Sequence, residues 1–150
     1  MRSSLRLISL LLLLCQLPCM ATENIDSVES REYNLLMQVR GQEVTSICMM
    51  NISPDGTIVG TVVSEMGMKA FDFTYERGKA NVLNVVAFLN KWYIRKVLKK
   101  DLAFILSNMF DGKDIVKKKR RLSFLPNGDI EAVNAKFNIH YTFTPMRSEE

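Results

Sequence analysis

Strand-like stretches dominate the hydrophobic pattern of the chain, and two of them meet within residues 57–75. Both are rich in β-branched and aromatic residues, and residues 70–75 alternate apolar with polar side chains as a half-buried strand does. The connection between them, residues 64–68, carries Met66 and Met68 around Gly67. Because solvent-facing turns are normally polar, two methionines in this turn need an explanation.

The stretches around this pair predict a meander of strands. Residues 32–39 and 43–52 predict two strands joined at Gly41, and Pro54 with Gly56 predicts a turn into the pair at 57–75. A hairpin at 76–79 leads to a short fifth strand, residues 80–84. Five sequential strands with short connections favour antiparallel pairing, because parallel neighbours need long crossovers.

From residue 85 onward, the spacing of the apolar residues changes from that of a strand to that of a helix. Within residues 85–110 an apolar stripe at spacings of three and four predicts one long amphipathic helix, made by Ile94, Val97, Leu98, Leu102, Ile105 and Met109. The earlier apolar residues fit this stripe less well, so residues 85–93 could form a separate turn or short helix. These are Phe88, Leu89, Trp92 and Tyr93. Gly112 is a stop signal for the helix.

Three further strands are expected at 119–125, 129–134 and 136–144. One helix cannot cover both faces of so large a sheet. We therefore predict an α+β fold in which a strongly curved antiparallel sheet, a half-barrel of about eight strands, wraps around one long helix. Such a fold encloses an apolar pocket suited to an elongated ligand. Its expected cavity lining is Phe71, Phe73, Trp92, Ile94, Leu98, Leu102 and Ile105.

The N-terminus has the pattern of an export signal. Arg2 and Arg6 precede an apolar run at 7–14, so residues 1–21 are expected to direct export and residues 22–31 to form a polar tether. Two processing routes stay open: cleavage after Ala21, or lipid attachment at Cys19 as in a bacterial lipoprotein. Pro18 directly before Cys19 departs from the small residue usual there. No later apolar run is long enough to span a membrane.

The net charge and the cysteine content argue against nucleic-acid binding and against a reactive cysteine. The chain has a net charge of +4, which becomes near +2 without Arg2 and Arg6, so the balance does not point to nucleic acid. Outside the signal only Cys48 remains, in an apolar strand, where it is expected to be a small buried residue.

Chemistry-bearing residues are sparse. His140 is the single histidine, and no cluster of histidine and cysteine has metal-ligand spacing. No glycine-rich loop precedes a helix in the phosphate-binding manner. We therefore predict a protein without catalysis, metal or cofactor. An enzyme acting on a lipid-like substrate ranks last, with His140, Asp72 and Asp101 as its candidate residues.

The densest charge run has two interpretations. In the first, the basic side chains are exposed to solvent at the start of a strand and have no special role. In the second, they contact anionic lipid headgroups, and each basic residue contributes about 1 kcal/mol to membrane binding. The run is Lys117, Lys118, Lys119, Arg120 and Arg121.

The order of elements and several short segments resemble the LolA/LolB family of bacterial lipoprotein carriers and acceptors, including LolB-like lipoproteins of unassigned role. The resemblance is carried by residues 60–71, 89–94 and 121–124, together with Asn127-Gly128, and extends over residues 33–143. Residues 32–145 are thus the expected lipid-binding domain, and 146–150 a C-terminal tail. The chain departs from LolB in being shorter and in the residues before Cys19.

The resemblance implies a half-open barrel that holds the acyl chains of a lipoprotein and a loop whose apolar tip contacts the membrane. Met66 matches that tip, so Met66, Gly67 and Met68 are the expected lipid-transfer loop, with Met68 turning back toward the core. The implied protein is periplasmic or bound to the outer membrane of a Gram-negative bacterium, with a chaperone-like role in lipoprotein transport and a periplasmic carrier as a possible partner. Two alternatives remain: both methionines fold back to close the barrel, or the domain binds protein without lipid.

Overall fold

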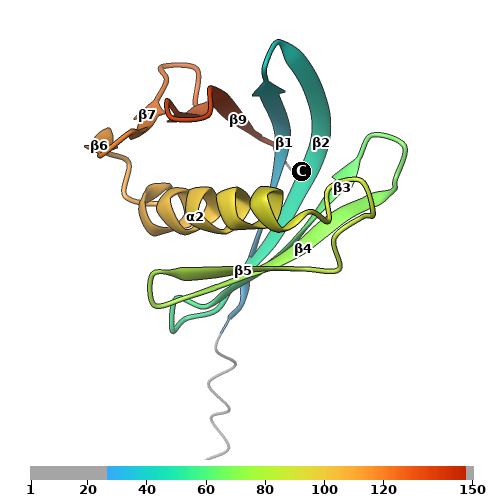
Figure 1. The fold of residues 1–150 in the computed structure, drawn as a ribbon. Helices are drawn as coiled ribbons and strands as arrows, with labels where there is room; N and C mark the ends of the chain where they lie inside the picture. The colour runs from blue at the N-terminus through green and yellow to red at the C-terminus, as the bar shows by residue number, and fades with distance from the viewer. Residues whose placement is uncertain (1–26, 148–150) are drawn as a thin grey trace, which may run out of the picture.

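Nine strands and one helix make up the part of the chain that the computed structural model describes, residues 27–147. The strands form one antiparallel sheet in the order β5-β4-β3-β2-β1-β9-β8-β7-β6 (Figure 1). The elements are β1 (Glu29–Val39), β2 (Gln42–Ile52), β3 (Ile58–Ser64), β4 (Lys69–Glu76), β5 (Lys79–Leu83), α2 (Trp92–Asn108), β6 (Ile115–Lys117), β7 (Arg120–Phe124), β8 (Ile130–Asn134) and β9 (Ile139–Pro145).

Two meanders make this sheet, and α2 connects them. Strands β1 to β5 form the first and β6 to β9 the second, and they join where β1 pairs with β9, with Leu35 opposite Phe143. The chain thus leaves the sheet at edge strand β5, crosses one face as α2, and returns at edge strand β6 (Figure 1). No helix within residues 27–147 has the length and apolar content to span a bilayer.

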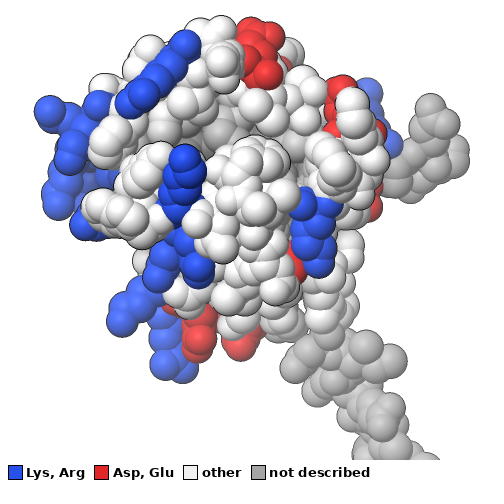
Figure 2. Space-filling view, turned by 45° about the vertical axis from the view of Figure 1, so that its right-hand side comes forward, with Lys and Arg blue, Asp and Glu red and all other residues white. Residues whose placement is uncertain are grey.

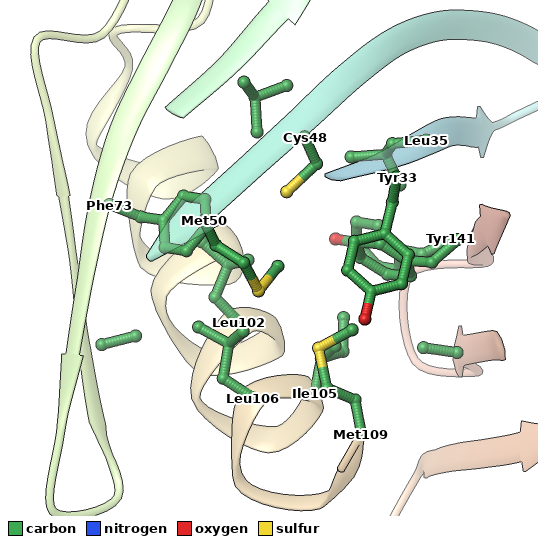
Figure 3. Packing of buried hydrophobic residues seen from close by; sticks show 14 of the residues in the cluster. Tyr33, Leu35, Cys48, Met50, Phe73, Leu102, Ile105, Leu106, Met109 and Tyr141 are labelled. Atoms are coloured by element: carbon green, nitrogen blue, oxygen red, sulfur yellow. The ribbon is translucent and has the colours of Figure 1, made fainter. Parts of the chain in front are cut away.

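The face of the sheet toward α2 is the hydrophobic core. Alternation along each strand places one set of side chains under the helix, as Tyr33 and Leu35 of β1 or Tyr141 and Phe143 of β9 illustrate. The buried side of α2 consists of Leu98, Leu102, Ile105 and Leu106. Figure 3 shows the last three facing the strand side chains. Cys48 lies in this core, and burial raises the pKa of its thiol to about 12, so the predicted inert role fits its surroundings.

The predicted half-barrel of about eight strands wrapped around one long helix is wrong. The sheet is open, has nine strands, and carries a helix of only 17 residues across one face. Strand β6 has three residues, too few for a periodic signal. Before the helix, residues 85–91 form a loop with a turn at 87–89, closed by the hydrogen bond from the N–H of Leu89 to the carbonyl of Val86, so the alternative of a separate turn is confirmed.

The ends of the domain also differ from expectation. Strand β1 begins at Glu29, opposite Ile52, so the last three residues of the expected tether belong to the sheet. At the C-terminus, the N–H of Met146 donates to the carbonyl of Glu32 at 2.9 Å. The expected signal, the lipidation candidate Cys19 and the first half of the tether lie outside residues 27–147.

A buried carboxylate joins α2 to the second meander. Asp101 is 2% exposed, and its Oδ1 accepts from Arg120 Nε at 2.7 Å and from Asn134 at 2.8 Å. Its Oδ2 accepts from the Tyr141 hydroxyl at 2.8 Å. Burial, followed by the Asp101 charge, raises the pKa of Tyr141 well above its usual value, so this hydroxyl keeps the proton it donates. On the other side, Arg95 donates to the Val82 carbonyl of β5 at 3.2 Å.

Gly60 lets two elements approach closely on the core face. It lies in β3 opposite Phe73 of β4, and the Phe73 ring occupies the space that a side chain would fill. A Cβ at this position would also lie 2.7 Å from the carbonyl oxygen of Met49. The residues around Gly60 in the sequence do not indicate this contact, because strand pairing brings Phe73 opposite it.

Asp101→Ala should lower the free energy of unfolding by about 3–5 kcal/mol, because it leaves Arg120 without its partner beside a buried Asn134 and Tyr141. Urea denaturation followed by circular dichroism measures this loss. Asp111→Ala, which removes an exposed acid just beyond the helix, is the matched control and should change stability by less than about 0.5 kcal/mol. Equal effects of the two substitutions would contradict the role of the buried carboxylate.

Gly60→Ala should destabilise the fold by about 1–3 kcal/mol, because the added methyl group overlaps the Phe73 ring. Combining it with Phe73→Leu tests the mechanism. The double variant should be more stable than the sum of the two single losses predicts, measured as coupling in thermal or urea unfolding. Strict additivity would show that the two positions do not compete for the same space.

Candidate functional site

The β3–β4 hairpin presents its two methionines to solvent. The turn is closed by backbone hydrogen bonds between Ser64 and Met68 at 2.8 Å and from Gly67 to Ser64 at 2.8 Å, and Gly67 has a φ of 77° that favours glycine. Met66 is 87% exposed and Met68 62% exposed. The expected return of Met68 toward the core is therefore wrong, as is the alternative in which both methionines fold back.

A second apolar segment adjoins the hairpin. The 2.8 Å hydrogen bond from Val86 to Ala70 holds the loop before α2 against the start of β4. This loop and the first turn of the helix expose Phe88 and Trp92, at 68% and 75%. Together with Met66 and Met68 we name these residues the apolar end. Figure 2 brings this side forward and shows uncharged side chains across its centre with Lys and Arg beside them.

Trp92 is thus not a cavity residue, although the sequence predicted it to be one. It lies at the first position of α2, outside the stripe that faces the sheet, and its ring packs edge-on against Tyr93 with centroids 6.0 Å apart. The signal was present in the sequence, since Phe88, Trp92 and Tyr93 fitted the helical stripe poorly. What the stripe could not show is that these residues gather beside the β3–β4 hairpin.

The remaining predicted cavity residues are core. Phe71, Phe73, Leu98, Leu102 and Ile105 are buried and belong to one packed cluster, and Ile94 packs against its margin. The Phe71 and Phe73 rings are 6.5 Å apart, and Figure 3 shows helix and strand side chains meeting between α2 and the sheet. These residues therefore pack the core under α2, and Phe73 also borders the groove on the other face of the sheet.

A groove of about 590 Å³ lies on the other face of the sheet, over β1 to β5. Asp72 is its most constrained polar group: its Oδ2 accepts from Lys69 Nζ at 3.0 Å and from Asn84 at 2.6 Å. Hydrogen bonds, above all from Asn84, lower the pKa of Asp72 to about 2. A carboxylate that is ionised and fully engaged is poorly suited to proton transfer.

The three residues considered for catalysis lie apart. Asp101 faces the core, while Asp72 on β4 and His140 on β9 face outward with three strands between them in the sheet order. His140 borders a smaller groove with Gln38 and Glu43, which bond to each other at 2.6 Å. Within residues 27–147 no three side chains of histidine, cysteine, aspartate or glutamate are placed to hold a metal.

The predicted headgroup residues divide into two groups. Lys117, Lys118 and Lys119 are exposed on the β6–β7 hairpin, whereas Arg120 turns inward to Asp101 and Arg121 lies 3.5 Å from Glu131. This hairpin and the β3–β4 hairpin are on opposite sides of the molecule, with α2 between them (Figure 1). The structure therefore separates Lys117–Lys119 from the β3–β4 hairpin and places Arg120 and Arg121 beside acids, and a headgroup role for the exposed lysines stays a prediction.

Comparison with known proteins assigns no family to the chain. Neither family models nor curated proteins give a match. The LolA/LolB resemblance thus rests on the residues named above and stays a prediction.

The ionisation of Asp72 should make the free energy of unfolding depend on pH in the acid range. Its pKa is lowered from 3.8 to about 2 in the folded protein, so the ionised form stabilises the fold above about pH 4, and this stabilisation is lost as the pH falls toward 2. Urea midpoints of the wild type and Asp72→Asn should differ at pH 7 and converge near pH 2. A difference that persists unchanged at pH 2 would contradict the lowered pKa.

Proposed function

We propose that this protein is a non-catalytic lipid-binding module that contacts the surface of a bilayer through the apolar end. The observation that carries the proposal is the exposure of Met66, Met68, Phe88 and Trp92 on two segments joined by a backbone hydrogen bond. Scattered exposed apolar residues need no explanation, but a group of large ones marks an interaction site.

The energetics favour a membrane interface. A methionine held in water forgoes about 1.5–3 kcal/mol of burial, and dipping the tip into the acyl boundary regains part of it. Tryptophan and tyrosine favour this depth because each combines an apolar ring with a polar group. Lys91 and Lys96, both exposed near the start of α2, are suited to anionic headgroups at about 1 kcal/mol each.

This proposal differs from the acyl-chain carrier that the LolA/LolB resemblance implies. A carrier needs room for acyl chains, and the residues predicted to line that room are packed core. The proposed contact is therefore with the membrane surface rather than with chains held inside the fold. The periplasmic or outer-membrane location is what the LolA/LolB resemblance implies, and it requires the expected export signal at residues 1–21. Mass spectrometry of the mature N-terminus tests that signal, with Cys19 or Thr22 as the first residue.

Vesicle binding can be followed through Trp92, because it is the only tryptophan in the chain. Titration with vesicles of phosphatidylcholine and phosphatidylglycerol should shift its emission to shorter wavelength as the ring leaves water. Met66→Glu should weaken binding by about 10- to 100-fold, since it replaces about 1.5–3 kcal/mol of burial with a charge.

Val116→Glu is the matched control. Val116 is 72% exposed but lies on β6, away from the apolar end, so the substitution should leave both fold and vesicle affinity unchanged. A wild type that neither shifts its emission nor sediments with vesicles would refute lipid binding and favour the alternative, an exported protein-binding module. Equal losses from Met66→Glu and Val116→Glu would refute the site.

A further inference from the structure

Two turns form a basic surface at the far side of the molecule from the apolar end. Lys117, Lys118 and Lys119 belong to the β6–β7 hairpin, and Lys136 to the β8–β9 turn; all four are exposed. The backbone N–H of Ala135 donates to the carbonyl of Lys119 at 2.8 Å, so the two turns adjoin. We name these four lysines the basic end.

The segment that carries three of these lysines is strongly basic. Residues 111–121 contain six basic and two acidic residues, a net charge of +4, which equals that of the whole chain. The acids nearby are already engaged: Asp101 with Arg120, Glu131 with Arg121, and Asp114 with the N–H of Phe124 at 2.9 Å. Within residues 27–147 none of the four lysines has an ion-pair partner.

Exposed apolar groups lie among these charges. Val116 is 72% exposed, and Phe137 is 41% exposed with the Lys136 ammonium 5.1 Å from its ring centroid. Strand β6 ends the sheet, so one of its sides has no neighbouring strand. A basic surface with an aromatic residue and an open strand edge suits an extended acidic polypeptide better than a flat layer of headgroups.

The basic end lies apart from the apolar end, which is the proposed membrane contact. Helix α2, which at 17 residues is about 25 Å long, lies between the two hairpins (Figure 1). With the apolar end in a bilayer that lies across the axis of α2, the basic end is farther from the headgroups than the distance of about 10 Å to which screening confines charge interactions.

We propose that the basic end binds an acidic segment of a partner protein while the apolar end contacts the membrane. The inference rests on the proposed function for its orientation, since lipid binding is what fixes the apolar end to the bilayer. Because the surface is basic, charge complementarity favours a partner segment of consecutive Asp and Glu residues, which would lie extended alongside β6. The opposing interpretation is that lysines on an edge strand only prevent self-pairing of the sheet.

Co-sedimentation of full-length protein with phosphatidylcholine vesicles and fluorescent poly-L-glutamate tests the proposal. The wild type should carry poly-L-glutamate into the vesicle pellet. Lys117→Gln/Lys119→Gln should pellet normally but carry about fivefold less or lower still, as expected from two exposed ion pairs. The matched control, Lys99→Gln/Lys100→Gln, removes the same charge from exposed positions on α2 and should behave as wild type.

Several outcomes would overturn the proposal. Equal losses in both double variants would mean a response to net charge alone. Weaker binding of Lys117→Gln/Lys119→Gln to phosphatidylglycerol vesicles would identify a headgroup site instead. Self-association of that variant in size-exclusion chromatography, with poly-L-glutamate binding intact, would identify edge protection.

Failure of the proposed function is separable from failure of this inference. A wild type that does not sediment with vesicles refutes lipid binding. Fluorescence anisotropy of poly-L-glutamate without vesicles still tests the basic end, and a wild type that binds it no better than Lys117→Gln/Lys119→Gln refutes the acidic-partner site.

Discussion

The buried carboxylate of Asp101 is the interaction on which the arrangement of helix and sheet depends. It accepts hydrogen bonds from Arg120, Asn134 and Tyr141, on β7, β8 and β9, so one helical side chain sets where three strands lie relative to α2. A buried charge is costly unless every polar neighbour is satisfied, and here each carboxylate oxygen has a donor. Such a network tolerates little sliding of the helix, which apolar contacts alone would allow.

The rigid attachment of α2 gives the molecule two chemically different ends. The start of the helix and the loop before it lie against the β3–β4 hairpin, where Met66 and Trp92 are exposed. Beyond its other end the chain enters the β6–β7 hairpin with Lys117, Lys118 and Lys119. Because the core between them is packed, the proposed activities belong to the surface at these ends and not to a cavity inside the fold.

Much of the strand pattern could be predicted because alternation and turn chemistry are local. The strands near residues 32–84 and 119–144, the hairpin at Asn127-Gly128 and the stripe of α2 from Ile94 to Met109 followed from spacing alone. Strand β6 did not, since three residues carry no period. The loop before α2 could be part of the helix or a separate turn on the sequence alone, because both segments are apolar. The role of Asp101 was invisible, because its partners lie 19, 33 and 40 residues away.

By itself, the sequence determined that Met66 and Met68 occupy a turn, that five basic residues are consecutive, and that few groups could support catalysis. Only the tertiary structure decided that Met68 and Trp92 point outward, that Phe71 and Leu102 are core, and that Arg120 turns inward from its run. The reason is physical: local propensity specifies where a strand or turn forms. Whether a side chain is buried depends on what packs against it from distant parts of the chain.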